Sequence, residues 1–328
     1  MRDKSIDIAK GVGIFLVVVG HGFSGKTNIE ILIYGFHMAF FFIISGMLYG
    51  QKNIDYQFDF YKKFRTLIIP YMFFELMWCV CLAIMNVNNP AWEWKEIILK
   101  MITFKGNIAT WYLPCLFLVE WLFSVIVHLG RMQYLVVMAC FVMGIIIPEQ
   151  LNNLMLLFLR PLVAIGFFGI GYYGYRIFKK NCPKCIYCGM AILYIIITLQ
   201  NGLILFYVRE FNNPVMFVFS SIIGTYLMLN VSTSISKMKR TNFLYVKFNY
   251  WGENSLIIMC VHMFLIEFIR LVDYKFLGNI FPQMNELEGI VMAIIVMSSC
   301  EIIVPVLNKY FYFLLGKRLK GVRHQKFQ

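Results

Sequence analysis

The sequence predicts an all-α membrane protein, a bundle of about ten transmembrane helices. Hydrophobic residues make up 60% of the 328 positions, charged residues make up only 14%, and the mean hydropathy is +0.71. A soluble chain carries roughly a quarter charged residues, because its surface must face water. The apolar residues also gather in successive segments, each near the ~20 residues that cross a hydrocarbon core as a helix. Both observations exclude an ordinary soluble protein.

Ten apolar segments are long enough to be considered as spans. They are residues 6–23, 31–50, 66–86, 111–129, 133–148, 154–175, 186–207, 214–231, 252–271 and 287–315. The last segment is long enough to be tilted or broken near Pro305. No polar linker or appendage divides the chain, so residues 1–328 are predicted to form one membrane domain of undetermined oligomeric state.

The distribution of lysine and arginine predicts that both termini are cytoplasmic. With the N-terminus inside, these residues concentrate in the N-terminal tail, the even-numbered connections and the C-terminal tail 317–328. Cytoplasmic loops of membrane proteins carry such an excess. The net charge of +13 therefore follows from topology, since no basic domain suited to nucleic acid is present. We expect a multi-pass protein of the cell membrane.

Three ionisable residues follow one face of the first predicted span. Eleven residues separate Lys10 from His21, and at about 100° per residue Asp7, Lys10 and His21 share a stripe that extends over roughly 16 Å beyond Lys10. Ionisable side chains inside a membrane are costly and usually mark a functional site. A simpler reading of Asp7 and Lys10, three residues apart, is an ion pair at the membrane interface.

Short motifs around these residues resemble a known family. The first fifty residues contain Asp7-Ile8-Ala9-Lys10-Gly11, Gly20-His21, Phe36-His37-Met38 and Phe41-Phe42-Ile43-Ile44-Ser45-Gly46. Further motifs are Lys63-Phe64-Arg65 with Pro70-Tyr71, Trp111-Tyr112-Leu113-Pro114, and Gly252-Glu253-Asn254-Ser255 with His262. This pattern resembles acyltransferase family 3, a family of integral membrane acyltransferases, and within it the fucose 4-O-acetylase type. The resemblance is weak through residues 130–240.

The resemblance implies transfer of an acetyl group from cytoplasmic acetyl-CoA to a hydroxyl of a cell-surface glycan or of its lipid-linked precursor. A sugar hydroxyl is a poor nucleophile, and an imidazole can take its proton, so His21 is the candidate general base. His37 and Asp7 are expected to assist, and Lys10 with Arg65 to hold the CoA phosphates. Lys10 stands where many members of the family have arginine, which keeps the charge but loses the bidentate geometry.

The later motifs are expected to contact the acceptor. These candidates are Trp111, Tyr112, Asn254, Ser255 and His262. Simpler structural roles exist for most of them: Trp111 and Tyr112 suit an aromatic belt at the outer interface, and Asn254 with Ser255 suits the capped start of the ninth span. The small residues of Ser45-Gly46 favour a role in close helix packing over a role of Ser45 as a nucleophile.

Other possibilities remain open at the level of sequence. A transporter or flippase for a glycan or small metabolite would use the same buried ionisable groups. No metal is expected: Cys182, Cys185 and Cys188 lack a suitably spaced fourth ligand and are interpreted as reduced cysteines. Five further ionisable residues fall within spans without identified partners, namely Glu75, Glu120, Arg160, Glu267 and Glu301.

Overall fold

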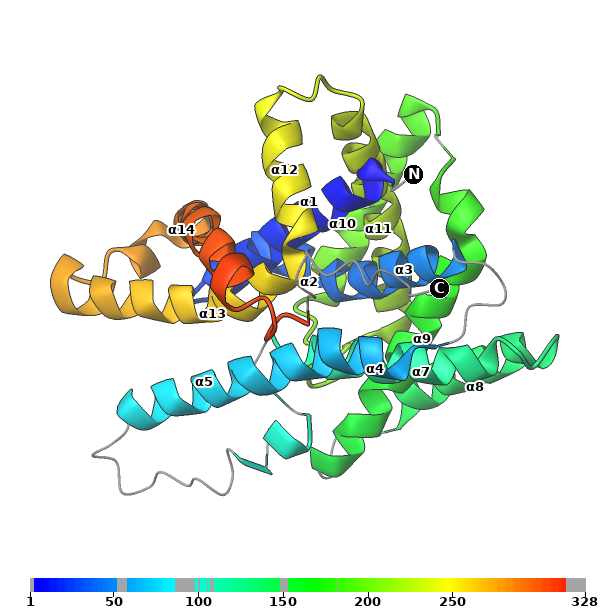
Figure 1. The fold of residues 1–328 in the computed structure, drawn as a ribbon. Helices are drawn as coiled ribbons and strands as arrows, with labels where there is room; N and C mark the ends of the chain where they lie inside the picture. The colour runs from blue at the N-terminus through cyan, green and yellow to red at the C-terminus, as the bar shows by residue number, and fades with distance from the viewer. Residues whose placement is uncertain are drawn as a thin grey trace, which may run out of the picture.

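A computed structural model describes residues 3–51, 58–85, 98–99, 101–104, 106, 109–147, 153–180 and 182–316. These residues form an all-α bundle (Figure 1), and the only β contact among them is an isolated bridge between Leu205 and Glu210. The C-terminal tail 317–328, which carries part of the predicted cytoplasmic charge, lies outside the described residues, as do Arg2, Lys52, Lys95, Lys100 and Lys105.

The helices follow the predicted spans closely. The first half of the chain forms α1 (Lys4–Gly22), α2 (Asn28–Tyr34), α3 (His37–Gly50), α4 (Phe60–Lys63), a π-helical turn (Phe64–Ile68), α5 (Ile69–Met85), α7 (Tyr112–Ile126) and α8 (Met132–Ile146). The second half forms α9 (Asn153–Phe178), α10 (Lys184–Asn201), α11 (Pro214–Ser236), α12 (Phe243–Glu253), α13 (Ser255–Val272) and α14 (Glu288–Tyr310).

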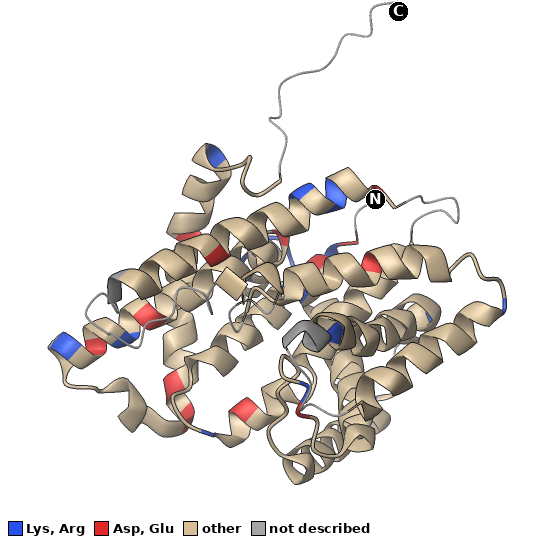
Figure 2. Cartoon of the chain, turned by 90° about the horizontal axis from the view of Figure 1, so that it is seen from below, with Lys and Arg blue, Asp and Glu red and all other residues tan. Residues whose placement is uncertain are grey.

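Eight helical segments in the described part of the chain are long and apolar enough to cross a membrane. Two further apolar helices, α7 and α8, have 15 residues each and are about 22 Å long. Together these ten segments match the ten predicted from hydropathy. The chain is thus a polytopic helical membrane protein, and charged residues are sparse along its helices (Figure 2).

Of the two alternatives for the last span, tilted or broken near Pro305, the structure excludes the break. Helix α14 continues through Pro305 to Tyr310, and the irregular backbone lies before the helix, where a 3₁₀ segment (Phe281–Leu287) contains Asn285 at φ 49°. Proline removes a single helical hydrogen bond, and α14 packs against α13, which helps it to continue as one helix.

Helix α1 lies at the centre of the bundle. It contacts α2, α3, α11, α12, α13 and α14 (Figure 1). Most of its side chains are buried. Glycine permits the closest approach, because a Cβ on Gly252 of α12 would overlap the carbonyl oxygen of Asp7, and one on Gly11 would overlap the carbonyl oxygen of Phe248. Small residues allow membrane helices to pack backbone to backbone in this way.

A second glycine contact joins α3 to α9. A Cβ on Gly46 would overlap the carbonyl oxygen of Phe168, and a Cβ on Gly171 would overlap that of Ile43. The packing role expected for the Ser45-Gly46 motif is therefore confirmed for Gly46.

Polar contacts group the loops into two ends of the bundle. At one end Asp3 pairs with Lys179 at 2.7 Å, and Lys4 pairs with Glu253 at 2.7 Å. Burial raises the pKa of Asp3, but hydrogen bonds from Lys179 and Ser5 outweigh it, so that the pKa of this carboxyl lies below its usual value. The N-terminus and the loop after α9 thus share one end, as the alternating spans require.

The opposite end gathers the segments that follow α1 and precede α14. The carboxylate of Glu288 accepts hydrogen bonds from the backbone amide and the hydroxyl of Ser24, and Glu286 accepts one from the amide of Asn28 at 3.0 Å. These contacts fix the short connection between α1 and α2, which positions the end of α1 relative to α13 and α14.

Candidate active site

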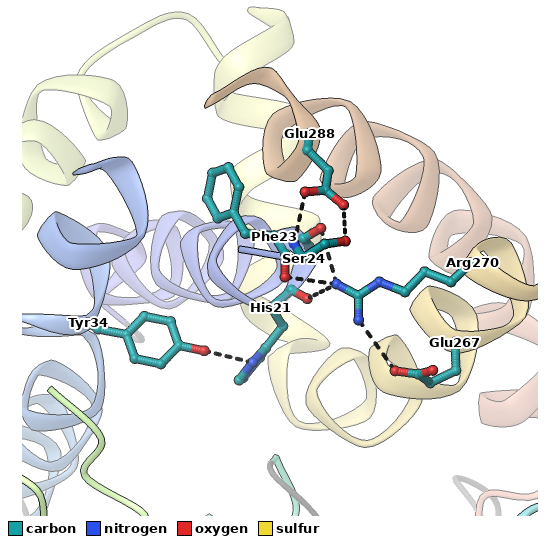
Figure 3. Close-up of polar contacts among 8 residues, drawn as sticks. His21, Phe23, Ser24, Tyr34, Glu267, Arg270 and Glu288 are labelled. Atoms are coloured by element: carbon teal, nitrogen blue, oxygen red, sulfur yellow. Dashed lines mark hydrogen bonds and ion pairs between the residues drawn. The ribbon is translucent and has the colours of Figure 1, made fainter. Parts of the chain in front are cut away.

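His21 lies in the last turn of α1, where three helices meet. Its Nδ1 is 2.9 Å from the hydroxyl of Tyr34, the last residue of α2 (Figure 3). Its ring centroid is 5.4 Å from that of His262 on α13. The ring of His37, at the start of α3, is 4.7 Å from the ring of Tyr34. Three of the five histidines of the chain therefore form one cluster, built from α1, α2, α3 and α13.

The hydrogen bonds of the cluster define the protonation of two imidazoles. Nδ1 of His37 lies 3.0 Å from the carbonyl oxygen of Ile33, and Nδ1 of His262 lies 3.0 Å from that of Ile258. A carbonyl oxygen only accepts, so Nδ1 carries the proton in both residues and Nε2 of the neutral ring is left as an acceptor. Both of these rings are buried, whereas His21 is partly exposed and is the most accessible of the three.

Arg270 fixes the end of α1 beneath the cluster. Its Nη2 donates to the carbonyl oxygens of Phe23 at 2.8 Å, His21 at 3.3 Å and Gly22 at 3.4 Å, and its Nη1 lies 3.5 Å from Glu267 (Figure 3). The last carbonyls of a helix have no partner within the helix and carry partial negative charge, so a guanidinium is well suited to them. Arg270 therefore holds the backbone that carries the His21 imidazole.

A cavity of about 160 Å³ opens nearer the other end of the same helices. Its walls include Lys10 and Ile14 of α1, Phe41 and Ser45 of α3, Tyr112 of α7, and Ser255 and Met259 of α13. The hydroxyls of Ser45 and Tyr112 are 3.3 Å apart. Three of the predicted site residues, Lys10, Tyr112 and Ser255, thus line one cavity.

Helical periodicity connects this cavity to the histidines. His37 lies four residues before the cavity residue Phe41, and His262 lies three residues after the cavity residue Met259. His21 lies seven residues after Ile14. Each of these spacings returns to the same helix face. The cavity and the histidine cluster consequently lie along one inner surface of α1, α3 and α13.

Other predicted site residues lie elsewhere. Asp7 is buried 14 residues before His21, roughly 21 Å along the same helix, and does not touch the cluster. Arg65 lies in the π-helical turn before α5.

Trp111 is buried rather than placed in an interfacial belt. It is 2% exposed, its ring stacks on Phe206 at 5.6 Å, and the guanidinium carbon of Arg160 lies 5.4 Å from the ring centroid. The belt expectation is wrong because the aromatic cluster around α9 and the loop 202–213 encloses the start of α7.

Asn254 occupies the predicted N-cap position of α13 but does not cap it. Its side-chain amide donates to the carbonyl of Tyr250 at 2.9 Å, and its Oδ1 accepts from Asn308 at 3.2 Å. The side chain therefore joins α12 to α14 instead of satisfying the free amides of α13.

Three of the ionisable residues within the spans have side-chain partners. Glu120 pairs with Lys63, Glu301 with Lys247 and the indole of Trp251, and Glu75 accepts from the hydroxyl of Thr110. Such pairing is what a membrane interior demands of charged groups.

Sequence reasoning missed Tyr34 and Arg270. Neither belongs to a recognisable motif, and both lie at helix ends where a polar residue is ordinary. The one available signal was the spacing of eight residues between His262 and Arg270, which could have placed Arg270 on the same broad side of α13 as His262.

The cysteines form no disulfide, since all nine are free thiols. Within the described ranges, no group of three or more histidine, cysteine, aspartate or glutamate side chains is arranged to hold a metal ion. Cys182, Cys185 and Cys188 are partly or fully exposed at the start of α10.

Fold and site together define a polytopic helical membrane protein in which a histidine cluster and a mostly apolar cavity, whose lining includes Lys10, lie along its central helix. Residues 3–304 match the family model of acyltransferase family 3, described as an acyltransferase domain, and the chain belongs to this family. It is therefore an acyltransferase, and this assignment favours the transferase class over the transporter class that the sequence left open. No curated protein and no solved structure matches the chain.

Proposed function

We propose that the enzyme transfers an acetyl group from cytoplasmic acetyl-CoA to a hydroxyl of a cell-surface glycan or of its lipid-linked precursor. His21 is the general base of this proposal, because it lies on the central helix and is the most accessible member of the cluster of three histidines. The particular type is that of the fucose 4-O-acetylases, as the motifs of the first fifty residues suggest. The enzyme then resides in the cell membrane with both termini in the cytoplasm.

The donor enters from the end of the bundle that carries the N-terminus. Lys10, and Arg65 at the same end, supply positive charge for the CoA phosphates, and the cavity lined by Lys10, Tyr112 and Ser255 supports passage of the pantetheine arm. The helical rise from Lys10 to His21 is roughly 16 Å, comparable with an extended pantetheine. This placement brings the thioester near His21.

Chemistry at His21 requires one tautomer of its ring. With the Nδ1 proton donated to the Tyr34 hydroxyl, Nε2 is free to take the proton of the acceptor hydroxyl. The acceptor oxygen attacks the thioester carbonyl, the carbon–oxygen bond forms and the carbon–sulfur bond breaks. The imidazolium then returns the proton to the CoA sulfur, so that the products are the acetyl ester and CoA thiol. His262 and His37 present further Nε2 acceptors beside His21. Asp7 lies near the end of the bundle at which the donor is proposed to enter.

The test uses purified protein, radiolabelled acetyl-CoA and an extract of surface-glycan precursors. We expect label in the glycan and release of free CoA with the parent protein, and loss of both with His21→Ala. His128→Ala is the matched control, since His128 is an exposed histidine outside the cluster. Equal transfer by the parent and His21→Ala would refute the role of His21, and binding of acetyl-CoA without transfer to any acceptor fraction would refute the proposed reaction.

A further inference from the structure

A groove of about 340 Å³ lies between the C-terminal halves of α5 and α13. Its walls are apolar apart from one residue, with Trp78, Cys81 and Leu82 on α5 and Phe264, Phe268 and Leu271 on α13. Phe268 is 63% exposed, and the Trp78 ring packs edge-on against Phe264 at 5.2 Å. The volume falls in the range of small-molecule binding sites, about 300–1,000 Å³.

The remaining wall residue gives the groove a charged end. Glu267 lies in the groove and pairs with Arg270, whose guanidinium contacts the carbonyl oxygens of His21 and Phe23 (Figure 3). A carboxylate in a groove that faces lipid is costly and marks a functional position. The apolar groove is therefore joined to the candidate base through a single ion pair.

We propose that the groove binds the hydrocarbon chain of a membrane amphiphile, whose hydroxyl-bearing head group is the acyl acceptor. This proposal rests on the proposed function and selects a lipid-linked acceptor over a finished glycan. The aromatic and aliphatic walls suit a hydrocarbon chain, and the groove opens to the hydrocarbon from which such a chain would enter.

The polar end of the groove suits the head group. The Glu267 carboxylate accepts hydrogen bonds from hydroxyls, and Arg270 donates to hydroxyl or phosphate oxygens. Glu267 lies five residues beyond His262, about 7.5 Å further along α13, so the head group is held at the end of the bundle where the histidines gather. An amphiphile is the ligand whose two parts match both ends of this groove.

Binding is tested without any need for turnover. The protein is placed in nanodiscs with a dodecyl glucoside that carries a diazirine at the end of its chain, and the cross-linked peptides are mapped after illumination. We expect cross-links at residues 78–82 and 264–271. Cys81→Trp fills the groove and should lower this cross-linking about tenfold, which is the effect of about 1.4 kcal/mol of lost binding.

Val80→Trp is the matched control, because Val80 is the adjacent residue on α5, is 49% exposed and does not line the groove. Leu271→Trp, on the opposite wall, checks that any loss comes from filling the groove and not from misfolding of α5. Cross-links spread evenly over lipid-facing helices such as α8 and α10, and equal in all variants, would identify ordinary bilayer contact and overturn the proposal.

The acceptor assignment has a separate readout. Membranes containing each variant receive radiolabelled acetyl-CoA, and the label is divided between chloroform–methanol-extractable lipid and aqueous glycan. Loss of lipid label in Cys81→Trp, with unchanged label in Val80→Trp, supports the proposal, and unchanged lipid label in Cys81→Trp overturns it. Absence of label with the parent, together with cross-linking in the groove, would overturn the proposed reaction while leaving the amphiphile site in place.

Discussion

Arg270 offers the sharpest test of how the cluster is positioned, because it acts on His21 only through the backbone. Its best hydrogen bond, to the carbonyl oxygen of Phe23 at 2.8 Å, is charge-assisted, and such bonds contribute about 1.5–3 kcal/mol. The interaction of the cation with the C-terminus of α1 adds about 0.3–1 kcal/mol. Since the Arg270 side chain is 30% exposed, the lower part of this sum applies, about 2 kcal/mol.

We expect Arg270→Gln to lower kcat about 30-fold, which is the rate equivalent of 2 kcal/mol. The physical reason is displacement of the last turn of α1, because small misplacements of a catalytic group are costly. Arg270→Lys keeps the charge but has no planar fork, and should fall between the parent and Arg270→Gln. The dissociation constant for acetyl-CoA should stay unchanged, since the cavity that includes Lys10 lies toward the other end of α1.

The assay combines acetyl transfer kinetics with direct binding of acetyl-CoA to purified protein. Arg176→Gln is the matched control, because Arg176 is an exposed arginine near the end of α9. A normal kcat in Arg270→Gln with a lowered Tm would show that Arg270 only stabilises the fold, and a loss of acetyl-CoA affinity equal to the loss of kcat would show a general collapse of the bundle. Either result would refute a positioning role.

Substitutions at three further positions and one pH series test the site and the fold. Tyr34→Phe removes the hydroxyl that contacts the α1 imidazole and should lower kcat about tenfold, the value of one hydrogen bond, with little change in the KM for acetyl-CoA. Lys10→Ala should raise the KM for acetyl-CoA while changing kcat less, and Lys10→Arg should retain affinity, because the proposed contact needs charge. A lower kcat with an unchanged KM in Lys10→Ala would contradict this contact. Gly171→Ala places a Cβ against a backbone oxygen of α3 and should destabilise the protein by about 1–3 kcal/mol, measured as a lower Tm in detergent. Asp3→Asn should lower Tm at neutral pH, and because the pKa of Asp3 is depressed by Lys179, the difference from the parent should disappear as the pH falls below about 4; a constant difference at every pH would refute the ion pair.

Some features of the site could be read from the chain because they repeat along a single helix. The stripe that contains Lys10 and His21 depends only on α1 being helical, and α1 runs unbroken from Lys4 to Gly22. Likewise, Ser255 and His262 lie on one face of α13, where one lines the cavity and the other contacts His21.

The contacts between helices could not be read in the same way. Nothing in the sequence places His262 beside His21, which lies 241 residues earlier in the chain, or brings Tyr34 between His21 and His37. In lipid, helices do not associate by hydrophobicity, so the choice of neighbour depends on close packing at glycines such as Gly11 and Gly252 and on a few polar contacts. Such contacts depend on the shapes of both helix surfaces, and each surface is formed by a different part of the chain.

The sequence by itself determined that this is a multi-pass helical membrane protein with ionisable groups on its first span, because hydropathy and helical periodicity are local properties. It also carried the motifs of the acyltransferase family. Only the tertiary structure decided that three histidines share one site, that Arg270 holds the end of α1, and that Trp111 is buried against Phe206. Those arrangements depend on which helices meet and at what height, which is fixed by the packing of the whole bundle.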